Sequence, residues 1–308
     1  MITVVRSALK IGAAAAAMGA YGLVHAQTME PLSYTNSPIG LNFVVAGYSY
    51  QSGSVLADPS LPINNVKATV DSATLAYSHI VDCWGQSGSV ALVVPYVWLS
   101  ASGDVLEQQR SVGRTGLSDV TLRISVNLYG APALSLKEFS QYHQDIIVGA
   151  SLLVTAPSGE YIASKLVNIG TNRWSFMPSL GISKALKQWT FEGAAGVTFF
   201  TDNDEFLGND TRHQDPLFSV QGHVIYNFNR KLWVALDGTY YTGGRTSVNG
   251  GALNDDLQRN SRWGATLAYS LTRRNSIKLY FSAGLTERSG TDFRIAGIAW
   301  QYRYGAGL

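Results

Sequence analysis

The sequence is poor in cysteine and in charge, and it has no long hydrophobic run after its first 26 residues. Its single cysteine, Cys83, excludes an intrachain disulfide, so stability must come from another source. Charged residues make up 14% of the chain, whereas a soluble domain has about a quarter. No apolar run after residue 26 approaches the roughly 18 residues that a membrane-spanning helix needs. The chain therefore matches neither a typical soluble domain nor a helical membrane protein.

The N-terminus has the layout of a secretory signal peptide. Arg6 and Lys10 form a short basic region, an alanine-rich apolar run follows over 11–24, and Ala26 ends a small-x-small cleavage pattern. We predict a cleaved Sec-type signal over 1–26, and an uncleaved N-terminal anchor is the alternative. Both charges of this segment are basic, so the remaining chain has 21 Lys and Arg against 21 Asp and Glu. This balance gives no net charge to attract nucleic acid.

Segments of about ten residues alternate in polarity from Pro38 to the end of the chain. Between Asp119 and Leu128 every even position is apolar and every odd position is polar. Side chains alternate faces along a strand, so each strand has one apolar and one polar face. In a transmembrane barrel the apolar face contacts lipid and the polar face lines the interior. The alternation predicts strands at 38–51, 66–82, 88–101, 115–129, 144–156, 172–186, 189–202, 214–228, 231–243, 260–272, 276–287 and 292–304.

The connections between these strands alternate in length, as they do in outer-membrane barrels with long outer loops and short periplasmic turns. One connection, 131–143, is long on the short-turn side, and the spacing of Ser135 and Glu138 resembles a capping box. We therefore predict an all-β, antiparallel, up-and-down transmembrane barrel of about twelve strands, with one short periplasmic-side helix. The barrel is expected over 38–308, after a periplasmic N-terminal segment over 27–37. The long connections are 51–65, 102–114, 157–171, 203–213 and 243–259.

Ionisable and aromatic residues that the alternation directs inward are the candidate functional residues. Charges at membrane depth are costly unless they are hydrated or paired. One interpretation is a set of salt bridges that holds a narrow barrel shut, which the small interior favours. The other is a filter that guides a polar or aromatic solute. The lumen-lining candidates are Asp119, Arg123, Glu192, His223, Asp237, Tyr241, Arg262, Lys278 and Tyr280.

Residues of the types that carry catalysis are few and scattered. The four histidines after residue 26 occupy separate segments, and none has a metal-ligand spacing to another. A lipid-acting enzyme with a serine–histidine pair would have His79 as its lipid-side histidine, but the neighbouring Ser78 belongs to the opposite strand face. We therefore predict no catalytic site, no metal and no cofactor.

Several stretches are typical of one family of outer-membrane proteins. The most distinctive is 125–161, and the others are 38–43, 58–63, 93–96, 168–176, 201–204 and 240–245. Together they resemble the meta-pathway of phenol degradation family, often labelled simply "transporter", over nearly all of the chain after the signal. The resemblance implies an outer-membrane protein that admits phenol-like or other hydrophobic aromatic compounds. It carries over no functional residues.

These observations together predict passive uptake of small solutes, phenol-like compounds among them, across the outer membrane of a Gram-negative bacterium. The expected partners are outer-membrane lipid, a small hydrophobic or aromatic solute and the barrel assembly machinery, with no nucleic acid. A closed structural or surface-interaction barrel without transport is the alternative. A lipid-acting outer-membrane enzyme is the least favoured hypothesis.

Overall fold

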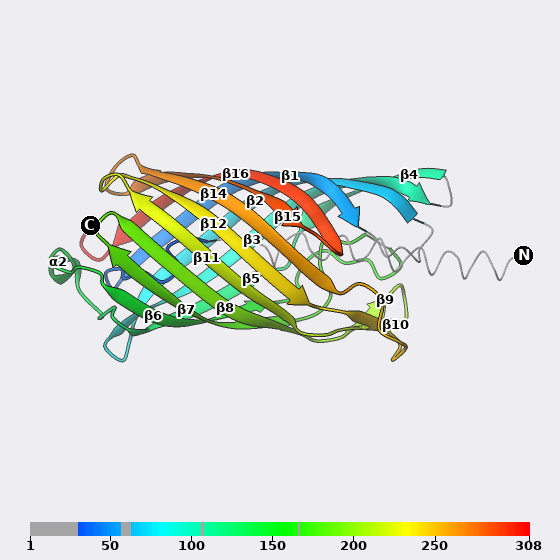
Figure 1. Cartoon of the computed structure of the whole chain (residues 1–308), viewed down its shortest axis with the longest axis horizontal. Helices are drawn as coiled ribbons and strands as arrows, with labels where there is room; N and C mark the ends of the chain where they lie inside the picture. The colour runs from blue at the N-terminus through cyan, green and yellow to red at the C-terminus, as the bar shows by residue number, and fades with distance from the viewer. Residues whose placement is uncertain (1–29, 57–62, 106–107, 166) are drawn as a thin grey trace, which may run out of the picture.

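The structure, a computed structural model, describes residues 30–56, 63–105, 108–165 and 167–308. Within these residues the chain forms a closed antiparallel barrel of twelve strands (Figure 1), which confirms the predicted fold class. β4 and β5 follow each other as one wall strand beside β3, and pairing of β2 with β3 closes the barrel. The wall consists of β1 (Leu41–Leu56), β2 (Ile63–Cys83), β3 (Gln86–Val105), β4 (Gln108–Leu117), β5 (Thr121–Tyr129), β6 (Ile146–Thr155), β7 (Ser175–Leu186), β8 (Trp189–Phe200), β11 (Leu217–Asn227), β12 (Leu232–Gly243), β14 (Gln258–Ser270), β15 (Asn275–Thr286) and β16 (Gly290–Gly305).

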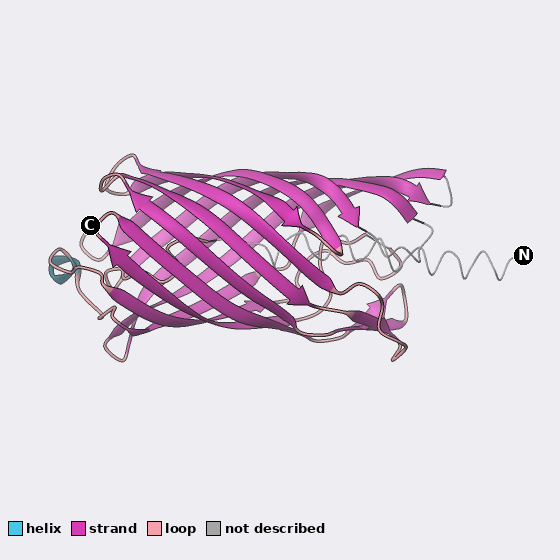
Figure 2. Ribbon diagram, viewed as in Figure 1, coloured by secondary structure: helices cyan, strands magenta, loops and turns pink. Residues whose placement is uncertain are grey.

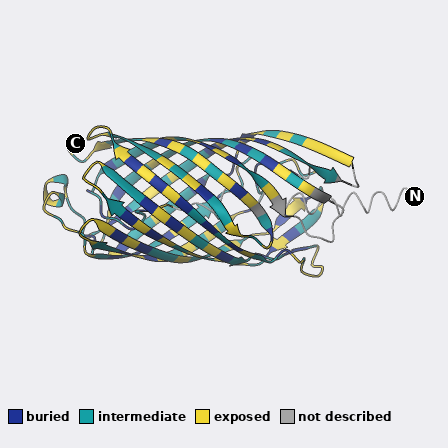
Figure 3. Cartoon of the chain, turned by 45° about the horizontal axis from the view of Figure 1, so that its top comes forward, coloured by how far each residue is buried: buried dark blue, intermediate teal, exposed yellow. Residues whose placement is uncertain are grey.

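Polarity along each strand separates the two faces of the wall. On β5, Thr121 and Asn127 are buried inside the barrel, whereas Ile124 and Leu128 are exposed on its outer surface. Buried and exposed residues alternate in the same way around the whole barrel (Figure 3). The outer surface is therefore apolar and the inner surface is largely polar, because a period of two places neighbours on opposite faces.

One end of the barrel has mostly short turns, and the C-terminus lies at this end (Figure 1). The exception is the connection between β5 and β6, which contains α2 (Leu136–Phe139), the helix drawn at that end in Figure 2. The Ser135 side chain accepts a hydrogen bond from the Glu138 backbone N–H, and the Glu138 side chain accepts one from the Ser135 backbone. This capping box confirms the short helix that the sequence predicts. No helix within the described residues is long and apolar enough to span a membrane.

The opposite end carries the long connections, and two of them contain more strand than the sequence predicts. β1 continues to Leu56, and β3 continues to Val105, which pairs with Gln108 of β4. The predicted loop 102–114 is therefore wrong, because residues 102–105 and 108–114 are paired strand residues of β3 and β4. Strands that extend beyond the apolar band of the barrel meet water on both faces, so their residues do not alternate between apolar and polar. Sequence patterns therefore predict loops at these positions.

A small second sheet covers part of the same end of the barrel. It contains β9 (Asn203–Phe206), β10 (Asp210–Gln214) and β13 (Thr246–Val248), in the order β13-β10-β9. These strands lie in the predicted loops 203–213 and 243–259. The long connections at this end are thus partly ordered by backbone pairing with one another.

A bulge interrupts the wall between β4 and β5. Leu117 pairs with Tyr96 and Thr121 pairs with Val93, so three residues of one strand oppose two of the other. One of those two is Pro95, which has no backbone N–H to donate to the neighbouring strand. The predicted strand 115–129 is therefore split, and Asp119 lies within the break.

Candidate functional site within the barrel

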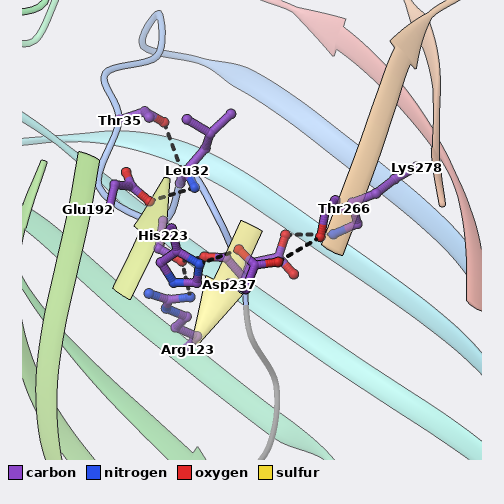
Figure 4. Close-up of polar contacts among 10 residues, drawn as sticks. Leu32, Thr35, Arg123, Glu192, His223, Asp237, Thr266 and Lys278 are labelled. Atoms are coloured by element: carbon purple, nitrogen blue, oxygen red, sulfur yellow. Dashed lines mark hydrogen bonds and ion pairs between the residues drawn. The ribbon is translucent and has the colours of Figure 1, made fainter. Parts of the chain in front are cut away.

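The N-terminal segment of the described chain, residues 30–40, enters the barrel from the short-turn end, and its residues 30–35 lie inside. The Leu32 backbone N–H donates to Glu192 Oε2 at 2.7 Å, and the side chains of Glu30 and Lys278 form an ion pair at 2.7 Å. Arg123 Nη1 donates to Ser33 Oγ at 3.3 Å. These contacts reach β5, β8 and β15, which lie on different sides of the barrel, and Figure 4 shows their side chains converging on the segment. The sequence predicts a separate periplasmic segment over 27–37, whereas its described part occupies the lumen.

A chain of buried polar side chains crosses four neighbouring strands at the level of this segment. Glu192 of β8, His223 of β11 and Asp237 of β12 are direct cross-strand neighbours. His223 Nδ1–H donates to Asp237 Oδ1 at 2.6 Å, and the Thr266 hydroxyl of β14 donates to Asp237 Oδ2 at 3.2 Å (Figure 4). Each of the three neighbours is at most 7% exposed.

The structure brings some of the nine predicted lumen residues together and separates others. Glu192, His223 and Asp237 form the polar chain, while Arg123 and Lys278 contact the N-terminal segment. The other four lie apart from this chain. The Tyr280 ring covers Gly297 on β16, Tyr241 and Arg262 lie nearer the long-loop end, and Asp119 lies in the wall bulge.

Asp119 organises a long connection instead of lining an open channel. It is fully buried, and its carboxylate accepts the backbone N–H of Gly159 at 2.9 Å and of Thr171 at 2.8 Å. The Thr171 hydroxyl donates to the same carboxylate at 2.6 Å. Because these bonds join both ends of the connection between β6 and β7, one side chain holds the connection closed.

This connection supplies an apolar surface inside the barrel that sequence reasoning missed. Val167 and Ile169 pack in a buried cluster with lumen-facing residues of β2, β3 and β16, including Val70, Leu99 and Phe293. An apolar lining is unusual in a barrel whose interior is otherwise polar. The sequence does contain apolar residues at positions that the alternation directs inward, and these could have predicted the apolar surface. We call this group of residues the apolar vestibule; its members are at most 8% exposed, so Val167 and Ile169 of the connection fill it in this structure.

Two polar side chains near the vestibule donate to backbone carbonyls, while Arg262 Nε and Nη1 have no hydrogen-bond partner among the described residues. Arg262 Nη2 donates to the Phe293 carbonyl at 2.5 Å, and Asn260 Nδ2 donates to the Ser289 carbonyl at 2.7 Å. In the described part of the chain, no group of three or more His, Cys, Asp and Glu residues is placed to hold a metal ion. The interior thus combines an apolar region at the long-loop end with a hydrogen-bonded polar region deeper in the barrel.

The comparison with family models decides the family. The model described as "Putative MetA-pathway of phenol degradation" matches residues 44–303, which is most of the chain and nearly the whole barrel. The chain belongs to this family. The match confirms the family that the sequence stretches resemble. No curated protein matches the chain in sequence.

Solved structures share the fold of this family member. The COG4313 outer membrane channel from Pseudomonas putida F1 is 20% identical, with a TM-score of 0.76, and covers 90% of this chain and 100% of its own. The transport unit of the autotransporter AIDA-I from Escherichia coli is 7% identical, with a TM-score of 0.52, and covers 94% of this chain and 99% of its own. Together with the apolar outer surface, the barrel places this family member in the outer membrane. Its short turns then face the periplasm and its long loops face outward.

Proposed function

We propose that this barrel passes small apolar aromatic solutes, phenol-like compounds among them, passively across the outer membrane. The observation that carries the proposal is the apolar vestibule. It lies inside the barrel at the extracellular end, where a solute from outside would first meet the lumen. A vestibule lined by Val70, Leu99 and Phe293 favours an apolar solute over a hydrated one, because burying apolar area releases about 25 cal/mol per Å².

Membership of a phenol degradation family supports the aromatic class of solute. Passive transport needs no energy source of its own, because metabolism inside the cell keeps the internal concentration of the solute low and the solute moves down its concentration gradient. The N-terminal segment and the connection between β6 and β7 both occupy the lumen, so passage requires one or both to move. The proposed role of the barrel is therefore that of a channel without catalytic chemistry.

A closed barrel without transport is the second candidate. The observation in its favour is the interior itself, because the N-terminal segment contacts three sides of the wall and Asp119 holds the long connection inward. If neither element moves, the protein is a structural or surface-interaction barrel. Uptake measurements separate the two candidates.

The test is the initial uptake of radiolabelled toluene by intact porin-deficient Gram-negative cells with and without the protein. Intact cells are needed because apolar aromatics cross phospholipid freely, so the lipopolysaccharide leaflet is the barrier to measure. We expect faster toluene uptake with the protein and unchanged uptake of glycerol, a polar solute of similar size. Leu99→Gln in the vestibule should reduce the gain, whereas Ser100→Gln on the outer surface should not. Equal toluene uptake with and without the protein would favour the closed barrel.

A further inference from the structure

The aromatic ring of Tyr34 is seated against two glycines of the barrel wall. Gly149 on β6 and Gly181 on β7 are direct cross-strand partners. A Cβ atom built on Gly149 would lie 2.6 Å from Tyr34 Cδ1, and one built on Gly181 would lie 2.1 Å from Tyr34 Cε2. Opposite edges of the ring therefore face the two glycines. The ring fills space that any other residue at these positions would occupy with its own side chain.

A third small residue extends this surface onto the next strand. Ala194 of β8 pairs with Gly181 and packs against the cluster that contains Tyr34. Tyr34 is 3% exposed, so its ring is almost completely removed from solvent. We call the surface formed by Gly149, Gly181 and Ala194 the glycine cradle. It is flat because three adjacent strands carry no side chain larger than a methyl group there.

Buried polar groups lie beside the glycine cradle. Glu192 is two residues from Ala194 on the lumen-facing side of β8, and it holds the N-terminal segment through the Leu32 N–H. His223, the cross-strand neighbour of Glu192, has a side chain that is 2% exposed, and its Nε2 has no hydrogen-bond partner among the described residues. Glu192 Oε1 likewise has no hydrogen-bond partner among the described residues, so two neighbouring buried polar atoms lack partners at this level of the lumen.

We propose that the glycine cradle is a binding site for one phenolic ring, and that Tyr34 occupies it as an internal competitor. The proposal rests on the proposed function, since it names the position at which a transported aromatic would pause. The Tyr34 side chain is itself a phenol, so the ring in the cradle is a chemical equivalent of the solute. Binding of a solute there displaces Tyr34 and with it the segment that crosses the lumen.

Competition of this kind makes a quantitative prediction. When a tethered group fills a site in most molecules, an added ligand can bind only the fraction in which the site is empty. The apparent affinity for the ligand is then the intrinsic affinity multiplied by that fraction. Short tethers produce effective concentrations of about 1 mM, so for a phenol that binds the empty cradle with a Kd of about 0.1 mM, removing the tyrosine ring should tighten binding by about tenfold. The loss of the ring also removes the steric barrier to entry.

The experiment measures binding of radiolabelled p-cresol, the free equivalent of the tyrosine side chain, to the detergent-solubilised full chain by equilibrium dialysis. We expect Tyr34→Ala to bind p-cresol about tenfold more tightly than the unmodified protein. Tyr50→Ala, which removes an outward-facing tyrosine, is the matched control and should leave the affinity unchanged. Heat-modifiable electrophoretic mobility verifies that each variant still forms a barrel.

A second substitution tests whether the gain comes from the glycine cradle. Adding Gly181→Val to Tyr34→Ala fills the cradle and should abolish the gain, whereas adding Gly238→Val, at a glycine with open space around it, should not. Equal affinity of Tyr34→Ala and the unmodified protein would overturn the proposal, as would a gain that survives Gly181→Val. If either of these results were found while the protein still accelerated toluene uptake, the proposed channel function would hold. Only the proposed competition by Tyr34 would then be wrong.

Discussion

Substitution of a single outward leucine by arginine tests the assignment of the apolar face to lipid. Leu180 is 62% exposed on the outer face of β7. It lies six residues from the exposed Trp174 and six from Leu186, which pairs with the exposed Trp189. At about 3.3 Å per residue and a strand tilt of about 40°, six residues span about 15 Å along the barrel axis. The two aromatic positions are then about 30 Å apart, which matches a hydrocarbon core and places Leu180 at its centre.

An arginine at the bilayer midplane costs about 2–4 kcal/mol in a barrel. Leu180→Arg should therefore lower the folding equilibrium constant by about 30- to 900-fold. Leu186→Arg is the matched control, because Leu186 is 51% exposed on the same strand but lies at the periplasmic interface, where the cost falls to about 0–1 kcal/mol. The assay is urea titration of folding into phosphatidylcholine vesicles, followed by tryptophan fluorescence. Equal losses at the two positions would refute the placement of this face in lipid.

Three further predictions concern the interior and the periplasmic helix. Asp237→Ala leaves the buried His223 Nδ1–H without its acceptor and should reduce the free energy of unfolding by about 1–3 kcal/mol in urea titrations; a loss no larger than that of an exposed Asp→Ala change would contradict this. Asp119→Ala removes three hydrogen bonds from the connection between β6 and β7, so trypsin should cleave at the exposed Lys165 faster than in the unmodified protein. Hydrogen bonds from the helix N-cap lower the pKa of Glu138 from its usual 4.5. The stability that ionised Glu138 gives to α2 is therefore complete above pH 4.5, and it is lost as the pH falls through the lowered pKa. Amide exchange in α2 should accelerate at that lower pH, and a rate independent of pH after correction for intrinsic exchange would contradict the assignment.

The sequence predicted the barrel wall well because lipid imposes a simple rule on it. Every residue of a membrane-spanning strand faces either lipid or lumen, so the alternation around Arg123 identifies both the strand and its inner face. The capping box at Ser135 was equally readable, since it depends on two residues three positions apart. Each of these features is determined by local sequence, and each is present in the structure.

The contents of the lumen could not be predicted in the same way. Tyr34 lies against Gly149 and Gly181, and nothing local in the sequence links a tyrosine near the N-terminus to glycines on two distant strands. Asp119 fits the polar alternation of the predicted strand 115–129, yet its partners come from the far ends of a connection that has no periodicity. The hairpin of β3 and β4 was missed because strands outside the apolar band carry polar residues on both faces.

The most direct test of a solute path through the barrel is the position of a bound aromatic compound. Crystals of the protein soaked in 4-bromophenol allow bromine to be located by its anomalous scattering. We predict bromine inside the barrel, either beside Val70, Leu99 and Phe293 of the apolar vestibule or, in molecules where it displaces Tyr34, at the glycine cradle. Bromine found only on the outer surface, among the lipid-facing side chains, would contradict passage through the lumen.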